Sequence, residues 1–533
     1  MPNVKLLDCT LRDGGYINRW KFGQKAIRDI LFGLSVSRMN IVECGFLTDC
    51  LYDPDASLFS GTQDIGTMLQ PGKNGSLYVA MIAIGEMELD PAQLPPVAES
   101  PIGGVRLTFR QGDVDKAFVY GQTLLDKGYK LFMQPVGTTN YTDAQMIDLI
   151  RRVNELNPYA FYIVDTLGMM YTKDLIRQFY LVDHNLASGI RVGYHSHNNL
   201  QMAFANAQAL IESGSARELI LDCSCSGMGR GAGNLCTELM MDYMNKYRDA
   251  HYDILPVLEI IDQYLIPILI AAPWGYSPAY YLAASNKCHP NYASFLLTNH
   301  SMNVRTIASV LDKIPQENRR YFDKNLIEAL YRAYQDNAVD DIAAIGALRQ
   351  RIGSREVLVI APGQSFVTQS EKIIKYVWKK KPFIIAVNFI PSQIILLDTD
   401  LIFVGNNRRY EEFADLLDTQ NAVFTSNIKD VPAGAMLVNY SDLTNPSPDA
   451  SDNSGIMVLK LLIKLGIKQV ALAGYDGFSR NQANNYALKS LAGLSDPTAL
   501  AYKSRAIGEQ LNICAQSLQI KFVTSTRYRI KRK

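Results

Sequence analysis

The chain of 533 residues has a mass of 59.5 kDa and a nearly balanced charge, with 53 Lys and Arg residues against 52 Asp and Glu residues. Its 48% hydrophobic and 20% charged residues exclude a disordered or fibrous protein, and the net charge of +1 gives no electrostatic signature of nucleic-acid binding. The N-terminus lacks the pattern of a secretory signal, and no apolar run reaches the roughly 20 residues of a membrane helix. Eight dispersed cysteines without a CxxC pair fit reduced thiols. We therefore expect a cytoplasmic protein without a membrane span.

The first 225 residues alternate between short apolar runs and segments with helical periodicity. The runs are Val4–Thr10, Asn40–Phe46, Leu77–Ala83, Gly103–Phe109, Lys130–Val136, Ala160–Thr166, Arg191–His197 and Glu218–Ser224. They lack a polar face, as expected of parallel strands that are buried on both sides. Eight strand–helix units predict a (β/α)8 TIM barrel. An open doubly wound sheet is the alternative, and the regular repeats without a Gly-rich loop after the first run argue against it.

The remainder of the chain is expected to form two further parts. Residues 253–350 have helical periodicity, and we interpret them as a helical extension over the barrel mouth. A second α/β pattern begins near Glu356, with apolar runs at Val357–Ala361, Phe383–Val387, Leu401–Val404, Ala422–Ser426, Met436–Asn439, Gln469–Ala473 and Ile520–Ser525. This pattern predicts an open, doubly wound, Rossmann-like domain. The expected domains are therefore 1–252, 253–350 and 351–533.

Polar residues gather at the predicted carboxyl ends of the barrel strands, where barrel enzymes have their active sites. His195 and His197 are two residues apart, so on a strand their side chains lie on one face. Asp13, near the end of the first strand, can meet them because in a closed barrel only the eighth strand separates the first strand from the seventh. Two imidazoles and a carboxylate suit a divalent ion such as Mn2+, Mg2+, Fe2+ or Zn2+. The alternative is a pair of histidines that hydrogen-bond to structural groups.

Arg12 lies next to Asp13 and cannot lose its proton at working pH. Beside a divalent ion, its guanidinium would stabilise an oxyanion such as an enolate. A salt bridge to Glu43 or Asp8 is the alternative role. Glycines at 229, 231 and 233 would let the backbone approach a ligand closely, and a structural turn explains this loop equally well.

Three motifs resemble one known family. Asp8-Cys-Thr-Leu-Arg-Asp-Gly14, His195-Ser-His197 and Gly227-Met-Gly-Arg-Gly-Ala-Gly-Asn234 occur in the order found in the metallolyase barrels named for their Asp-Arg-Glu triad, the DRE-TIM metallolyases. The chain is most similar to the 4-hydroxy-2-oxovalerate aldolase branch, over about residues 3–310, and Asn291–Leu296 resembles a Tyr-containing helix of that branch.

The resemblance implies a role for each matching residue. Asp13, His195, His197 and Asn234 would hold the metal, with Mn2+ expected and Mg2+, Zn2+ or Co2+ as alternatives. Arg12 would stabilise the enolate of pyruvate, Glu43 corresponds to the triad glutamate, and Tyr292 would line the aldehyde pocket. The implied substrates are a small 2-oxo acid and an aldehyde.

The sequence departs from the aldolase pattern at one position. Tyr16 stands three residues after Asp13, where the aldolases have a histidine base. A phenol with a pKa near ~10 is a poor base at neutral pH. His289, His300 or water would then take the proton, or the substrate differs.

The C-terminal part resembles bacterial CMP-sialic-acid-dependent sialyltransferases and Rossmann-like proteins related to pterin diphosphokinases, over about residues 355–480. The residues that would border a nucleotide or nucleotide sugar are Gly363, Ser365, Asn388, Ser454, Gly455 and Asp476. The sequence contains no histidine after His300, whereas those sialyltransferases use one as a base.

Three functional hypotheses follow. The first is a metal-dependent pyruvate aldolase fused to a nucleotide-binding domain, with a role in surface-polysaccharide sugar metabolism suggested by analogy. The second is an acyl-CoA-dependent Claisen condensing enzyme similar to isopropylmalate synthase. The third is a non-catalytic barrel whose C-terminal domain binds a nucleotide. Related barrels commonly dimerise, so we expect a homo-oligomer.

Overall fold

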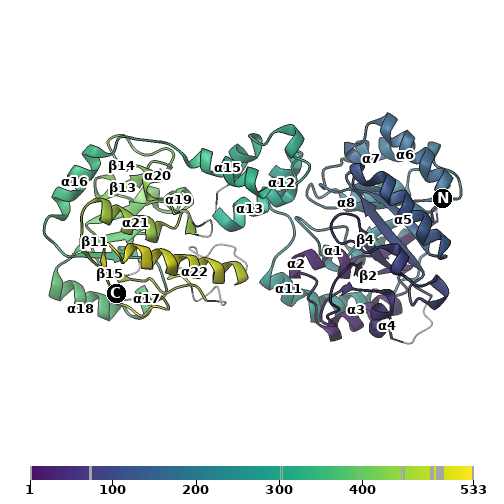
Figure 1. The fold of residues 1–533 in the computed structure, drawn as a ribbon, viewed down its shortest axis with the longest axis horizontal. Coiled ribbons are helices and arrows are strands. Elements are labelled where there is room, and N and C mark those ends of the chain that lie inside the picture. Colours follow the sequence, from purple (N-terminus) through teal and green to yellow (C-terminus); the bar gives the residue numbers. More distant parts are fainter. Residues whose placement is uncertain are drawn as a thin grey trace. The chain divides into compact units, whose positions relative to one another are not determined.

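The computed structural model describes residues 3–70, 75–300, 302, 304–393, 395–445, 447, 450–479, 485–487 and 497–530. The chain divides into two compact units (Figure 1). The first unit comprises residues 1–291 and 319–321, and the second comprises residues 292–318 and 322–533. The expected domain boundaries after residues 252 and 350 stay a prediction.

Eight parallel strands close into a barrel in the first unit. They are β1 (Val4–Asp8), β2 (Ile41–Leu47), β4 (Leu77–Ala83), β5 (Gly104–Phe109), β6 (Lys130–Pro135), β7 (Ala160–Asp165), β8 (Arg191–Ser196) and β9 (Leu219–Cys223). The sheet order is β1-β9-β8-β7-β6-β5-β4-β2, and pairing of β1 with β2 closes it. A short strand, β3 (Leu58–Phe59), pairs with β2. The predicted TIM barrel is confirmed, because each of these strands begins and ends within two residues of the ends of a predicted run.

Helices follow the strands and cover the outside of the barrel (Figure 1). They are α3 (Gln24–Val36), α4 (Thr62–Met68), α5 (Val114–Asp126), α6 (Asp143–Leu156), α7 (Thr172–Asn185), α8 (Ala203–Ile211) and α9 (Thr237–Tyr247). Two one-turn helices, α1 (Thr10–Asp13) and α2 (Gly15–Asn18), follow β1 at the carboxyl end of the strands. Outward-facing strand residues such as Leu6, Val42 and Leu107 pack against these helices in one large apolar cluster.

The inward-facing residues include both apolar and charged side chains. Leu7, Val79 and Phe132 belong to a separate buried cluster that contains Tyr162. The guanidinium of Arg106 lies 5.2 Å from the centre of the Tyr162 ring. The alternation of side chains along β5 explains this placement, since Leu107 faces the helices and Arg106 faces inwards.

The helical periodicity predicted for residues 253–350 is confirmed by a series of helices in this part of the chain. The helices are α10 (Leu255–Ile260), a π-helical turn (Ile261–Leu265), α11 (Ile266–Ala271), α12 (Pro278–Ser285), α13 (Pro290–His300), α14 (Val304–Asp312), α15 (Lys324–Gln335) and α16 (Ile342–Ile352). Among the described residues, no helix has the length and hydropathy needed to cross a lipid bilayer.

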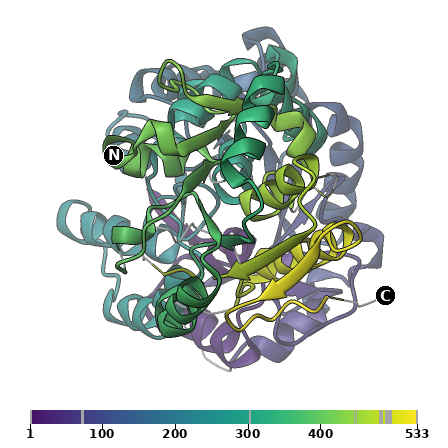
Figure 2. The ribbon, with the colours of Figure 1, turned by 90° about the vertical axis from the view of Figure 1, so that its left-hand side faces the viewer.

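A seven-stranded parallel sheet forms the centre of the second unit. Its strands are β10 (Val357–Ile360), β11 (Phe383–Val387), β12 (Leu401–Val404), β13 (Ala422–Thr425), β14 (Met436–Val438), β15 (Gln469–Ala473) and β16 (Gln519–Phe522). The order is β14-β13-β12-β11-β10-β15-β16. Figure 2 shows β15 and β16 side by side at the yellow end of the colour range.

Helices cover both faces of this sheet. They are α17 (Ser365–Thr368), α18 (Ser370–Lys380), α19 (Asn407–Phe413), α20 (Tyr440–Leu443), α21 (Ser454–Lys464) and α22 (Pro497–Cys514). Val357 and Val359 pack with α16, α21 and α22 on one face, whereas Leu358 and Ile360 pack with α17 and α18 on the other. The helices that follow β10 therefore cover one face of the sheet, and the helix that follows the neighbouring strand β15 covers the other. The carboxyl ends of β10 and β15 form the switch point of a doubly wound sheet.

The packing of the barrel predicts the effect of a cavity at Leu107, which is fully buried on β5. Leu107→Ala should lower the free energy of unfolding by about 3 kcal/mol, and Leu107→Met by less than about 1.5 kcal/mol, because methionine nearly conserves the volume. The measurement is urea unfolding followed by tryptophan fluorescence in a Trp378→Phe background. Trp378 is exposed in the second unit, so Trp20 and Trp274 then report on the first unit. Equal losses for both variants would contradict the packing described.

Candidate functional site

Asp13, His195 and His197 meet at the carboxyl end of the barrel strands. All three are buried, and their potential ligand atoms lie within 4.8 Å of one another. His195 lies near the end of β8 and His197 follows it directly, as the sequence predicts. Asp13 lies in the one-turn helix α1 after β1, and not on the strand itself. The three groups are close enough to share one cation.

A carboxylate orients the first histidine. The Nδ1 atom of His195 lies 3.0 Å from Oδ2 of Asp222, a buried residue on β9. A proton on Nδ1 satisfies this hydrogen bond and leaves the lone pair of Nε2 available. Carboxylates commonly hold metal-binding histidines in this way. The rings of His195 and His197 are nearly perpendicular, with centres 5.3 Å apart.

Asn234 joins the same cluster from the loop after β9. Its Nδ2 donates to Oδ2 of Asp13 at 2.6 Å, and its Oδ1 is buried without a hydrogen-bond partner. The glycines bring the loop close to the site. A Cβ at Gly229 would lie 2.9 Å from Asp13 Oδ2, and Gly233, with φ of +83°, would place a Cβ 2.1 Å from the Gly227 oxygen. The loop therefore needs these glycines in order to reach the site.

Arg12 belongs to a buried chain of ion pairs. It donates to Asp13 at 2.5 Å and to Oε2 of Glu43 at 2.9 Å. The same Glu43 oxygen accepts from Arg106 at 2.6 Å, and Arg106 also pairs with Asp222. This chain runs from Asp13 to the residue that orients His195. Arg12 therefore forms the salt bridge to Glu43 that the sequence analysis gave as one alternative. It also lies beside the candidate metal ligands, as the other alternative requires.

Several buried polar atoms of the cluster have no hydrogen-bond partner among the residues that the structure describes. They are Arg12 Nη2, His197 Nδ1, Glu43 Oε1 and Asn234 Oδ1. An unsatisfied buried donor or acceptor costs about 1–3 kcal/mol. A cation beside His197 and Asn234 and an oxyanion beside Arg12 would satisfy three of them, so the residues present fit a metal and an anionic ligand.

The electrostatic environment keeps the candidate ligands in the protonation states that metals require. Burial alone would raise the pKa of Asp13, but Arg12, His197 and His195 hold it well below its usual range. Burial lowers the pKa of His197 to about 3, and nearby positive charges contribute to the shift. A carboxylate and a neutral imidazole are the forms that bind divalent ions.

Tyr16 is a poor candidate for a general base. Burial raises its pKa to about 12, and its hydroxyl group donates to Glu86 at 3.1 Å. His289 is held in its neutral form, since burial lowers its pKa to about 3 together with the charges of Arg230 and Arg110. Its Nδ1 accepts the backbone N–H of Asn291, which places the proton of the neutral ring on Nε2. The side chain of His300 lies outside the described residues.

Tyr292 belongs to the second unit. It is fully buried there, and its hydroxyl group donates to the backbone oxygen of Asn318 and accepts the backbone N–H of Asp323. The aldehyde-pocket role that the resemblance implies for Tyr292 stays a prediction.

Sequence reasoning missed one residue of the site. Asp222 lies inside an apolar run and pairs with residues 27 and 116 positions away. The sequence did offer a signal for Asp222, because a carboxylate in the middle of a strand predicted to be fully buried needs a charged or hydrogen-bonding partner.

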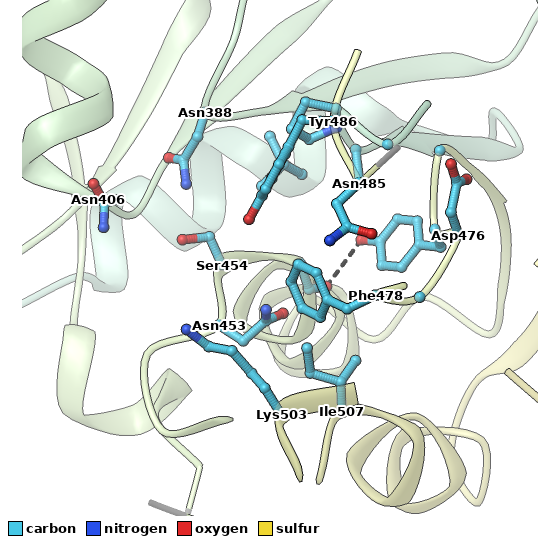
Figure 3. A pocket seen from close by; sticks show the side chains of 18 of the residues that line it. Asn388, Asn406, Asn453, Ser454, Asp476, Phe478, Asn485, Tyr486, Lys503 and Ile507 are labelled. Carbon is cyan, nitrogen blue, oxygen red and sulfur yellow. Dashed lines mark hydrogen bonds between the residues drawn. The ribbon is translucent and has the colours of Figure 1, made fainter. Parts of the chain in front are cut away.

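The second unit contains a cavity of about 200 Å³ at the switch point of its sheet (Figure 3). Gly363, Asn388, Ser454, Gly455 and Asp476, five of the six predicted residues, line it. The sixth, Ser365, lies beside the cavity and donates its backbone N–H to Asp476 at 2.7 Å. The sequence therefore identified residues that the structure brings together. Their role in binding a nucleotide stays a prediction.

The lining combines amides, aromatic rings and two cations. Asn388, Asn406, Asn453 and Asn485 surround the hydroxyl end of Tyr486, and Lys503 extends towards Asn453 at the start of α21 (Figure 3). Arg409 supplies the second cation.

Comparisons with known proteins bear on the barrel half of the chain. The sequence profile of the family described as HMGL-like matches residues 123–261, a range that contains His195, His197 and Asn234. A 4-hydroxy-2-oxovalerate aldolase from Moorella thermoacetica is 26% identical over 277 residues, which are 50% of this chain and 78% of the relative. The corresponding aldolase from Roseiflexus castenholzii is 22% identical over 294 residues, 51% of this chain and 80% of the relative.

A solved structure, the N-terminal domain of a Bacteroides vulgatus protein proposed to be an aldolase, matches with a TM-score of 0.46 at 22% identity. The match covers 57% of this chain and 99% of that one. The N-terminal half of the chain is thus similar in sequence to HMGL-like proteins and to 4-hydroxy-2-oxovalerate aldolases, which supports a lyase at the level of that family.

Proposed function

We propose that the barrel is a divalent-metal-dependent aldolase that forms or cleaves a C–C bond between pyruvate and an aldehyde. The observation that carries the proposal is the buried cluster of Asp13, His195 and His197 beside an unpartnered guanidinium nitrogen of Arg12. The similarity to 4-hydroxy-2-oxovalerate aldolases agrees with this chemistry.

Asp13, His195, His197 and Asn234 would hold the ion, with Mn2+ proposed and Mg2+, Zn2+ or Co2+ as alternatives. A bound divalent ion supplies a Lewis acid for a 2-oxo acid. The chain supplies the orientation of its ligands, because Asp222 holds the His195 ring, and Arg12 and Asn234 hold the Asp13 carboxylate.

Arg12 is the group that would stabilise the negative charge of the reaction. In the cleavage direction, the 4-hydroxyl group loses its proton and its oxygen forms the aldehyde C=O bond. The C3–C4 bond breaks, and its electron pair forms the enolate of pyruvate, which then takes a proton at C3. The Nη2 group of Arg12 has no hydrogen-bond partner in the described part of the chain and would donate to the enolate oxygen.

The proton of the 4-hydroxyl group needs an acceptor. Tyr16 and His289 are unsuited, because the pKa of the phenol is raised to about 12 and the His289 Nδ1 lone pair is already used. We assign this proton to a water molecule. Glu43 would act by positioning Arg12, since one of its oxygens accepts from both Arg12 and Arg106.

We also infer that the second unit binds a nucleotide or nucleotide sugar in its switch-point cavity. Ligands of doubly wound sheets bind in this crevice. The specific observation is that the cavity places the N-terminus of α21, Lys503 and Arg409 around one space, together with the aromatic ring of Tyr486. Cations and helix amides suit a phosphate, and the ring and asparagines suit a base and hydroxyl groups.

Removal of one imidazole should abolish retention of the metal. His195→Ala should bind Mn2+ at least about 100-fold more weakly than the wild type, since loss of an outer-shell partner alone costs 10–100-fold. Metal content after gel filtration, measured by mass spectrometry, tests this. His184→Ala is the matched control, because His184 is exposed on α7. Equal Mn2+ content in all three proteins would refute the site.

Arg12→Gln should slow deuterium exchange at the methyl group of pyruvate by about 100- to 1,000-fold, the usual cost of losing one oxyanion donor. Bound Mn2+ should remain, because Arg12 is not a ligand and the amide of the new glutamine still offers a donor beside Asp13. Exchange is followed in D2O by mass spectrometry with Mn2+ added. An unchanged exchange rate in a variant that keeps its metal would contradict the role of Arg12. Release of free CoA from acetyl-CoA, in place of pyruvate chemistry, would favour the Claisen alternative.

The cavity of the second unit is tested with the full chain and CMP, UDP, GDP and ATP. At least one nucleotide should raise the thermal unfolding temperature, and Lys503→Gln should weaken its binding by about tenfold through loss of a charged hydrogen bond. Lys375→Gln, on the exposed side of α18, is the control. No shift with any of the four nucleotides would count against the proposal.

A further inference from the structure

Arg230 is a cation of the barrel site that the proposed aldolase chemistry leaves unused. It stands between Gly229 and Gly231 in the loop that carries Asn234. The neighbouring Gly229 packs against Asp13 and Asn234 so closely that a Cβ would lie under 3 Å from both side chains. The loop therefore places residue 230 next to the candidate metal ligands.

The guanidinium of Arg230 stacks on an aromatic ring. Its central carbon lies 4.0 Å from the centre of the Tyr16 ring. The N–H groups of a guanidinium lie in its own plane, so stacking on a ring leaves them available to donate to an anion at its edge. The charge of Arg230 acts on Asp13, His197 and His289, so it lies near the metal cluster and near His289 together.

Arg230 differs from the other two arginines of the site. Arg12 and Arg106 each pair with two carboxylates. Within the part of the chain that the structure describes, no carboxylate forms an ion pair with Arg230 and no acceptor takes a hydrogen bond from it. Arg110 also acts on His289, and the nearby Glu86 lies 4.0 Å from Arg110. This edge of the site therefore carries an excess of positive charge.

The charges of the buried chain of ion pairs, which does not include the nearby Asp165, can balance the carboxylate of pyruvate without Arg230. The three carboxylates of Asp13, Glu43 and Asp222 and the two guanidiniums of Arg12 and Arg106 leave one negative charge. A divalent ion turns this into one positive charge, which the carboxylate of pyruvate neutralises. Arg230 is then left for an anionic group on the other substrate.

We propose that Arg230 binds a carboxylate or phosphate on the aldehyde half of the substrate, so that the barrel acts on an acidic aldehyde and the corresponding 4-hydroxy-2-oxo acid. The inference rests on the proposed aldolase function and adds the class of its second substrate. Arg110 contributes to the same positive edge, and the Tyr16 ring holds the Arg230 guanidinium in place. Burial is the main cause of the lowered pKa of His289, and an anion bound there would offset the smaller contribution of Arg230 and Arg110.

The test compares aldehydes of similar size with pyruvate and Mn2+. Succinic semialdehyde supplies a carboxylate, phosphoglycolaldehyde supplies a phosphate, and butanal supplies no charge. The wild type should use at least one of the two anionic aldehydes with a kcat/KM about 10- to 100-fold above that for butanal, the range that a charge-assisted hydrogen bond provides. The anionic aldehyde with the higher kcat/KM shows whether Arg230 binds a carboxylate or a phosphate.

Variants then assign the preference to Arg230. Arg230→Gln should remove the 10- to 100-fold preference through a higher KM for the anionic aldehyde, and leave kcat/KM for butanal within about threefold. Arg230→Lys should restore part of the preference. Arg28→Gln, which removes one exposed positive charge on α3, should change neither value. Unchanged Mn2+ content and pyruvate exchange in Arg230→Gln show that the site remains folded.

Two results would overturn the inference. The first is an equal kcat/KM for charged and neutral aldehydes in the wild type. The second is slower pyruvate exchange in Arg230→Gln, which would place the carboxylate of pyruvate on Arg230. Both results count only if the wild type exchanges the methyl protons of pyruvate. If the wild type shows no exchange with added Mn2+, the proposed aldolase function itself fails, which is a different outcome from failure of the Arg230 inference.

Discussion

The candidate site depends on a chain of buried ion pairs that crosses the barrel interior. Asp13 pairs with Arg12, Arg12 and Arg106 share one oxygen of Glu43, and Arg106 continues to Asp222. Each of these charges would be costly in the barrel interior without its partner. Removal of one member leaves a neighbour uncompensated, so the chain restricts the positions that Arg12 and Asp13 can adopt. Because Asp222 also holds His195, the same ion pairs orient ligands that come from β8 and from the helix after β1, on either side of β9. The geometry of the cluster is therefore a property of the closed barrel and not of any one loop.

The ion pairs satisfy most of the site, and the atoms that remain unsatisfied indicate what it binds. Arg12 Nη2 is a donor, while Asn234 Oδ1 is an acceptor and His197 Nδ1 can offer a lone pair. A site built only for stability would leave fewer such atoms, since each one reduces the free energy of unfolding. Donors and acceptors left over side by side are the arrangement expected where a cation and an oxyanion bind together. The glycine loop supports this view, because a larger residue at position 229 would fill the space next to Asp13.

The sequence predicted the architecture well because both sheets are parallel and buried. Strands of this kind are apolar on both faces, so their runs stand out from the helical segments between them, and the eight barrel strands were predicted to within two residues. The site was predictable where its residues lie close together in sequence, as His195 and His197 do. The turn of helix that carries Asp13 was missed, because four residues give no periodic signal. Asp222 was missed because its partners are distant in sequence, and only the closed barrel brings Arg106 and His195 to it.

The second unit also has a buried parallel sheet, but its sheet is open and has a cavity at the switch point. Its cavity lies where helices leave to opposite faces after β10 and β15, and Gly474, with φ of +74°, brings the two loops so close that a Cβ would lie 1.9 Å from the Ala361 oxygen. Asp476 packs against Gly363 beside this contact, and both its oxygens already accept hydrogen bonds from Ser365. A carboxylate held in this way shapes the cavity and is poorly placed to take a proton from a substrate. The sequence also has no histidine after His300. Of the carboxylates that line the cavity, Asp452 accepts from Tyr331 and Asp476 accepts from Ser365, so both are already held by side chains of the protein.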